Sequence, residues 1–163
     1  MTNKLILLSA CLSSFLVACD HQDEKIVTTT TQQNTSLFPK GERVTNNNFT
    51  GNTWLKTLVE ADSLNPISVG NVTFEPGSRT KWHSHPGGQI ILATDGTGYY
   101  QEKGKKIKIL RKGDVIKCQP NIIHWHGASP DEQFAQVAIT SRKPAPPVWL
   151  QPVTNAEYLG AKE

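Results

Sequence analysis

Hydrophobic and polar residues alternate along most of residues 49–141, in short runs separated by turn residues. Alternation with a period of two is typical of half-buried strands, and many short, evenly spaced strands indicate an all-β sandwich or barrel. Glycine, proline and aspartate mark the turns, as at Pro76-Gly77 and Asp95-Gly96. The expected strands cover residues 54–60, 69–75, 81–85, 89–94, 98–102, 107–110, 115–119, 122–127 and 134–140.

The first 18 residues follow a different pattern. Lys4 precedes an apolar run over residues 5–18, which is too short to span a bilayer and indicates a signal peptide. Residues 16–19, Leu-Val-Ala-Cys, resemble a bacterial lipobox, so 1–18 is expected to be a lipoprotein signal and Cys19 the acylated first residue of the mature chain. An ordinary secretory signal with an incidental cysteine is the alternative. The lipobox implies a location in the bacterial cell envelope, on the outer side of the cytoplasmic membrane (its periplasmic or extracellular face), and leaves open which membrane holds the anchor.

The rest of the chain divides into three parts. Residues 19–42 are polar and low in complexity, which predicts a flexible tether because such a segment buries too little apolar surface to order itself. Residues 43–141 are long enough for one domain with its own core. Residues 142–163 are proline-rich and predict an extended tail, with Trp149 and Tyr158 packing it onto the barrel and Thr154 capping one helical turn over 155–159.

Charge and cysteine content exclude some classes of partner. The net charge of +3 is mild, and the basic cluster over residues 103–112 has no interleaved aromatic residues, so no nucleic-acid partner is expected. We expect that cluster to lie on a solvent-exposed hairpin, and contact with anionic lipid headgroups is the alternative. Cys118 would be the only cysteine of the mature chain with a free thiol, and its place in an alternating strand predicts a small buried side chain.

Four of the five histidines lie in two short segments, at 82–89 and 123–126. His83 and His85 are two residues apart, so on a strand both imidazoles project to one face, and His124 and His126 share a face in the same way. Three imidazoles with the amide oxygen of Gln89 would form a metal site, and imidazole suits Zn, Cu, Fe or Ni. The alternative is a set of polar residues scattered over strand faces.

These residues stand at spacings that resemble conserved motifs of the cupins. Gly77, His83, His85, Gln89 and Gly96 resemble the first cupin motif, although glutamate usually stands where this chain has Gln89. Gly113-Asp114, with His124 eleven residues after Gly113, resembles the second motif. The resemblance implies a single cupin domain, an all-β double-stranded β-helix, or jelly-roll, barrel with an N-terminal flexible tether and an extended C-terminal tail.

A narrower resemblance is to the small single-domain cupins that include bacterial manganese-dependent hydroxynitrile lyases of the (R)-mandelonitrile lyase type. It implies one divalent ion, Mn(II) or Fe(II), held by His83, His85, Gln89 and His124. Zn or Cu remain alternatives, because both stand higher in the affinity order. Lyases of this type carry a histidine and a glutamine on the inward face of the last strand, where Gln136 and Thr140 stand here. The segments that carry the resemblance are 49–51, 74–77, 79–80, 82–86, Gln89, 124–128, Trp149 and Tyr158.

The neutral amide of Gln89 affects the chemistry that is expected. A divalent ion held by three imidazoles and an amide keeps its full charge, which favours Lewis-acid chemistry over oxygen activation. His126 is the expected general base, since it shares a face with His124 and is not needed as a ligand; a structural role is the alternative. Arg79 and Lys81 could neutralise an anionic product, but a salt bridge that holds the Gly77 turn is favoured for Arg79. Trp82 and Trp125 are out of phase with the ligands and should pack behind the site.

The favoured function is therefore a metal-dependent lyase acting on a small hydroxyl or carbonyl compound. A cupin dioxygenase with the same metal site, or a non-catalytic envelope module that binds metal or a small ligand, are the alternatives. The expected partners are a small-molecule substrate and the membrane, through the lipid anchor, and a homo-oligomer is left open. A small, mostly apolar substrate pocket is expected from Gly70, Val72, Ile91, Phe134, Gln136 and Thr140.

The lipobox generates the first testable prediction. Cys19→Ser removes the thiol that would be acylated, so it should block lipid labelling and leave an unprocessed or soluble form, because stable anchoring depends on the acyl chains. Lipid labelling, mass spectrometry and membrane fractionation measure this. Membrane retention and mass equal to those of the wild type would rule out the anchor.

Overall fold

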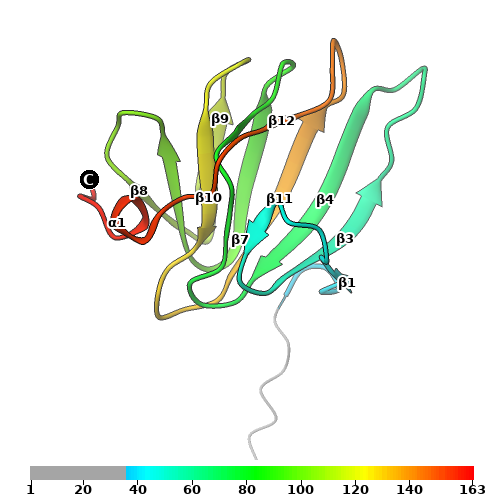
Figure 1. Cartoon of the computed structure of the whole chain (residues 1–163). Coiled ribbons are helices and arrows are strands. Elements are labelled where there is room, and N and C mark those ends of the chain that lie inside the picture. The colour runs from blue at the N-terminus through cyan, green and yellow to red at the C-terminus, as the bar shows by residue number, and fades with distance from the viewer. Residues whose placement is uncertain (1–35) are drawn as a thin grey trace, which may run out of the picture. The chain divides into compact units, whose positions relative to one another are not determined.

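The computed structural model describes residues 36–163, and nearly every regular element in that range is a strand (Figure 1). The predicted signal peptide, Cys19 and the predicted tether up to residue 35 lie outside the described residues. Within 36–163, no helix has the length and apolar character needed to cross a membrane. The elements are β1 (Glu42–Arg43), β2 (Phe49–Thr50), β3 (Thr53–Val59), β4 (Ile67–Phe74), β5 (Arg79–Thr80), β6 (His83–Ser84), β7 (Gln89–Glu102), β8 (Lys108–Arg111), β9 (Val115–Cys118), β10 (His124–Ala128), β11 (Phe134–Ser141), β12 (Val148–Trp149) and α1 (Asn155–Tyr158).

The strands pair in a curled antiparallel arrangement with two walls that share β7 (Figure 1). One wall runs β1-β3-β4-β11-β7 with β9 beside β7, and the other runs β7-β10-β5-β2 with β8 beside β7 and β6 beside β10. The expected all-β barrel is thus confirmed. Most predicted strands are present with ends shifted by at most two residues, whereas the predicted strand 81–85 is reduced to β6, with the separate short β5 before it.

β7 joins the two walls, and here the sequence prediction was wrong. A turn at Asp95-Gly96 was expected to separate two strands, but residues 89–102 form one strand of 14 residues. Its first part pairs with β9 and β11 and its last part with β8 and β10. Gly96 has a φ of 69° and lies where a Cβ would meet the Gln133 carbonyl oxygen at 1.8 Å. Together with the register shift at Ala135/Gln136, this glycine bends the strand without ending it.

Two hydrophobic clusters lie on opposite sides of the ligand strands. The inner cluster fills the space between the walls and includes Val72, Phe74, Ile91 and Phe134. The outer cluster lies behind the histidines, with Trp82 and Trp125 packed edge to face and their ring centroids 6.5 Å apart. Because successive residues of a strand face opposite sides, Trp125 points away from the cavity that His124 and His126 face. The prediction that both tryptophans pack behind the site is confirmed.

The C-terminal segment is held against the second wall. β12 pairs with β6, and Thr154 caps α1 as predicted, with Glu157 completing a capping box. The Tyr158 hydroxyl donates to the Ala128 carbonyl at 2.8 Å, at the end of β10. The predicted helical turn and the packing of Tyr158 are therefore confirmed, although α1 ends at Tyr158, one residue earlier than expected.

Arg79 connects this segment to the barrel. Its guanidinium donates to the carbonyls of Gly77 and Val153 and to Asn155 Oδ1, and it lies 4.4 Å from the centre of the Tyr158 ring. The side chain thus holds the Gly77 turn as expected, but the predicted salt bridge is wrong: within residues 36–163 no ion pair includes Arg79. Neutral acceptors replace the expected carboxylate.

The tail contact can be tested at Tyr158. Tyr158→Phe removes only the buried hydrogen bond to Ala128, and it should lower the free energy of unfolding by about 0.5–1.5 kcal/mol. Tyr158→Ala also removes the ring from the outer cluster and should cost about 3–5 kcal/mol. Denaturant titration of both variants measures the two contributions. A Tyr158→Phe variant as stable as the wild type would show that the hydrogen bond does not hold the tail.

Candidate metal centre

Three predicted ligands, His83, His85 and His124, converge at one point between the walls. Each offers a ring nitrogen, these nitrogens lie within 4.8 Å of one another, and all three side chains are buried. His83 on β6 and His124 on β10 are direct cross-strand partners, with ring centroids 4.3 Å apart. His85 follows β6, and its ring centroid is 5.0 Å from that of His83. The cluster could hold a metal ion, as the spacing predicted.

In two of these rings, a backbone carbonyl determines which ring nitrogen carries the proton. His83 Nδ1 is 2.9 Å from the Lys81 carbonyl oxygen, and His124 Nδ1 is 3.0 Å from that of Ile122. Because a carbonyl oxygen can only accept, Nδ1 is the protonated donor in both neutral rings, and each Nε2 keeps its lone pair. This is how ligand histidines are usually held, with the second nitrogen fixed by an outer acceptor.

Gln89, the first residue of β7, faces His124. Its amide nitrogen donates to Thr140 Oγ1 at 3.2 Å, and this turns Gln89 Oε1 toward His124 Nε2, 3.1 Å away. When His124 carries its proton on Nδ1, both of those atoms are acceptors, and their contact is then not a hydrogen bond.

Two buried acceptors in contact repel each other unless a cation lies between them. Two donor atoms that each lie about 2.1 Å from one ion at right angles are roughly 3 Å apart, which matches this contact. Both ring nitrogens of His85 are buried without a hydrogen-bond partner within the described residues. The donor set therefore fits a divalent cation.

Burial keeps the cluster uncharged. It is the main cause that lowers the pKa of His83 far below its ordinary value, the pKa of His85 to about 3 and the pKa of His124 to about 4. The nearby charge of Arg142 also contributes at His85. Neutral imidazole is the form that binds metals, so little proton competition is expected near neutral pH.

Cys118, at the end of β9, lies directly behind one ligand. Its sulfur is 3.2 Å from His124 Nδ1, and the side chain is buried, as the alternation predicted. Burial raises the pKa of the thiol, so it stays protonated and adds no charge beside the cluster. The contact with His124 was missed at the sequence level, because alternation along one strand gives burial and not the neighbour across the barrel.

A cavity of about 400 Å³ opens beside the three histidines. Phe49, Leu55, Val72 and Ala138 form its apolar side, and Pro146, Pro147 and Trp149 cover it from the C-terminal segment. The Trp149 ring stacks on His83, with centroids 4.6 Å apart and an angle of 27° between the planes. Trp149 was expected to pack the tail onto the barrel, and the structure also places it on the cavity wall.

The six residues expected to line a pocket divide into two groups. Val72 and Thr140 line the cavity. Ile91 and Phe134 lie in the inner cluster, and Leu55 fills the space beside Gly70, where a Cβ would meet its Cδ1 at 2.8 Å. Gln136 is fully buried and bonded to His126. Lys81 does not line the cavity, whereas Arg142, which the sequence analysis did not single out, does.

His126 lines the cavity without belonging to the three-histidine cluster. Its ring centroid is 5.3 Å from that of His83, and its edge packs on Phe74. The Gln136 amide nitrogen lies 3.0 Å from His126 Nδ1, while the amide oxygen has no partner among the described residues. An amide has a donor end and an acceptor end, so Gln136 can pair with either tautomer of this ring. Burial holds the pKa of His126 well below its usual value, which keeps the ring neutral.

Comparisons with known proteins agree with this architecture. A family model for the cupin domain matches residues 70–140. The (R)-mandelonitrile lyase of Granulicella tundricola is 38% identical over 111 residues, which cover 68% of this chain and 85% of that protein. A cupin-like protein from Thermotoga maritima superposes with a TM-score of 0.74 at 47% identity, covering 78% of this chain and 98% of the other.

A more distant structure supports the fold alone. A predicted oxalate decarboxylase from the same bacterium has a TM-score of 0.55 at 21% identity, covering 61% of this chain and 90% of the other. The region that the family model matches, residues 70–140, contains all four candidate ligands. The chain therefore belongs to the cupin superfamily, and it resembles (R)-mandelonitrile lyase.

Proposed function

We propose that this cupin is a metal-dependent lyase that breaks or forms a carbon–carbon bond in a small hydroxyl or carbonyl compound. The observation that carries the proposal is the contact of two acceptors, Gln89 Oε1 and His124 Nε2, 3.1 Å apart in a buried site. Such an arrangement suits a cation, and His83 and His85 would complete its ligand set. The similarity to (R)-mandelonitrile lyase supports the reaction class.

The ligand set favours Lewis-acid chemistry. A bound divalent ion would supply an electrophile that polarises a hydroxyl or carbonyl oxygen. The three imidazoles are neutral, and the fourth donor is an amide, so these side chains do not offset the charge of the ion. Mn(II) or Fe(II) is proposed by resemblance, while Zn and Cu bind more strongly in the general affinity order.

His126 is proposed to move the proton. It reaches the cavity beside the ligands and is neutral, and Gln136 supports it from behind. When the Gln136 amide oxygen accepts from Nδ1–H of His126, Nε2 has a lone pair and can accept a proton. When the amide nitrogen donates to Nδ1, Nε2 carries a proton and can donate it. Trp149 and the two prolines beside it would limit water in the cavity.

The proposed place of action is the outer side of a bacterial membrane, with Cys19 as the anchor. This part of the proposal rests on the lipobox-like residues 16–19 and on the polar segment that follows them. A chain that folds outside the cytoplasm meets Zn and Cu as well as Mn, so the metal content of protein from its native compartment matters.

The ligand set can be tested by metal content. His83→Ala and His124→Ala should each reduce the bound divalent ion from about one per chain to a small fraction, because each removes a neutral donor from a buried site. Gln89→Glu should retain the ion but lower turnover, since the added negative charge weakens the electrophile. Elemental analysis of folded protein measures this, with His21→Ala as the control that keeps its metal. Unchanged metal content in His83→Ala would refute the assignment.

The role of His126 is tested by separating binding from proton transfer. His126→Ala should keep the metal and the fold but lower turnover by about 10²–10⁴-fold, the usual contribution of general acid–base catalysis. His126→Gln, which keeps a neutral polar side chain, should lose as much. Turnover is measured under air and under nitrogen on the best substrate from a screen of small hydroxyl and carbonyl compounds that includes mandelonitrile. Undiminished turnover in these variants removes His126 from the mechanism, and a requirement for oxygen in the wild type would favour a dioxygenase.

A further inference from the structure

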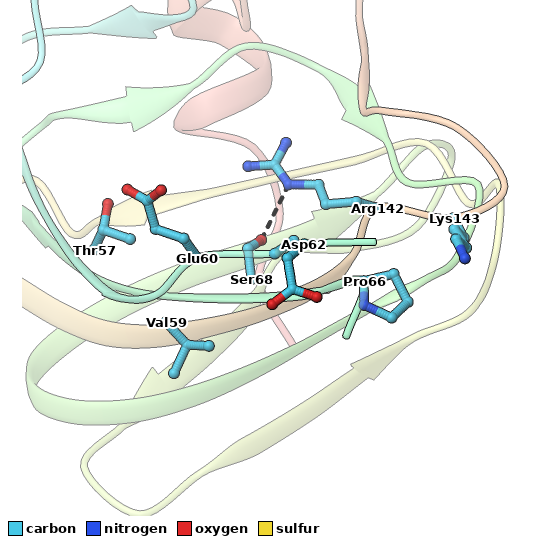
Figure 2. Close-up of a pocket in the computed structure, with 9 residues that line it drawn as sticks. Thr57, Val59, Glu60, Asp62, Pro66, Ser68, Arg142 and Lys143 are labelled. Carbon is cyan, nitrogen blue, oxygen red and sulfur yellow. Dashed lines mark hydrogen bonds between the residues drawn. The ribbon is translucent and has the colours of Figure 1, made fainter. Parts of the chain in front are cut away.

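One charged side chain, Arg142, reaches the rim of the metal cavity. It follows β11, two residues after Thr140, and so continues the face of that strand that turns toward the cavity. The same side chain also lines a second, outer groove of about 520 Å³ with Glu60, Asp62, Ser68 and Lys143 (Figure 2). Arg142 therefore stands between the outer surface and the buried histidines.

The guanidinium is oriented but not neutralised. Its Nε donates to Ser68 Oγ at 3.1 Å, shown by the dashed line in Figure 2, and its backbone nitrogen donates to the Pro66 carbonyl at 2.7 Å. Glu60 and Asp62 border the outer groove, yet no ion pair within residues 36–163 includes Arg142. Its two terminal NH₂ groups have no hydrogen-bond partner in that range and form the planar fork that binds carboxylates.

The charge balance of the cavity gives an independent reason to expect an anion there. The lining contains neutral asparagines, threonines and glutamine, apolar residues and the histidines, but no aspartate or glutamate. Apart from the histidines, Arg142 is the only ionisable side chain that the described chain presents to this space. Arg142 and the candidate ligand His85 line the same cavity. A divalent ion would add two further positive charges, none of them balanced by a carboxylate of the lining.

We propose that Arg142 determines substrate class by binding the carboxylate of a small hydroxy acid or oxo acid, with the hydroxyl or carbonyl oxygen of that acid toward the three histidines. This deepens the proposed function and rests on it. The apolar side formed by Phe49, Leu55, Val72 and Ala138 would take a short hydrocarbon substituent, which a cavity of about 400 Å³ can hold. Ser68 is the positioning residue that aims the guanidinium.

The experiment measures binding rather than turnover. The full chain is loaded with Mn²⁺, its metal content is measured, and glycolate, lactate and mandelate are titrated by calorimetry beside their neutral primary amides. At least one acid should bind more tightly than its amide. Arg142→Gln should raise the dissociation constant of that acid by about 10–100-fold, the usual contribution of a hydrogen bond to a charged group. It should change the dissociation constant of the amide by less than about twofold. Arg142→Lys, which keeps the charge and loses the fork, should be intermediate.

Lys143→Gln is the matched control, because it removes the same charge from a neighbour that lines the outer groove but not the cavity. It should leave the dissociation constants of both acid and amide unchanged. The inference is overturned if no acid binds more tightly than its amide, if Arg142→Gln leaves acid binding unchanged, or if Lys143→Gln weakens it equally. Preference for the acid that depends on Arg142, with no turnover of any compound, would refute the proposed lyase and leave Arg142 as the carboxylate-binding residue of a ligand site. The same titration on metal-free protein should still show the Arg142→Gln effect.

Discussion

The contact between Gln89 Oε1 and His124 Nε2 depends on partners that belong to different parts of the barrel. The Ile122 carbonyl, just before β10, holds the proton of His124 on Nδ1, and Thr140 on β11 holds the amide nitrogen of Gln89. With both orientations held in this way, the two lone pairs face each other inside a buried site. A cation between these two atoms would remove that repulsion. His83 lies next to the contact because β6 pairs with β10 directly at His124.

The bend of β7 makes this convergence achievable. Gln89 lies in the part of the strand that pairs with β11 and β9, while the far end of the strand pairs with β10, which carries His124 and His126. Without the bulge between Ala93 and Asp95 and the bend at Gly96, one strand could not belong to both walls and curl the sheet over the cavity. The outer aromatic cluster then supports the ligand strands from behind, so that the imidazoles are held between two packed layers.

Local sequence signals were sufficient for most strands, for the burial pattern and for the three histidines that could hold a metal. Same-face spacing in His83/His85 and His124/His126 is a property of one strand, and the structure brings three of those rings together. Contacts across the barrel were not accessible in this way. The continuity of β7 through Asp95-Gly96 depends on pairing with β11. Two of the three acceptors of Arg79 come from a segment more than 70 residues later, and Trp149 reaches His83 only because β12 pairs with β6.

The replacement of the usual glutamate by Gln89 and the presence of Arg142 have the same electrostatic consequence. A glutamate ligand would cancel one charge of a bound ion and would repel a substrate carboxylate in this buried site, where Coulomb interactions are stronger than in water. With a neutral amide there, the lining of the cavity contains no anion. The histidines are also neutral, because burial disfavours their charged form. The charge of a bound ion would then be balanced by an anion that enters the cavity. An anionic substrate would supply that negative charge on binding. Glutamine in place of glutamate at position 89 would therefore strengthen the electrophile and also favour an anionic substrate.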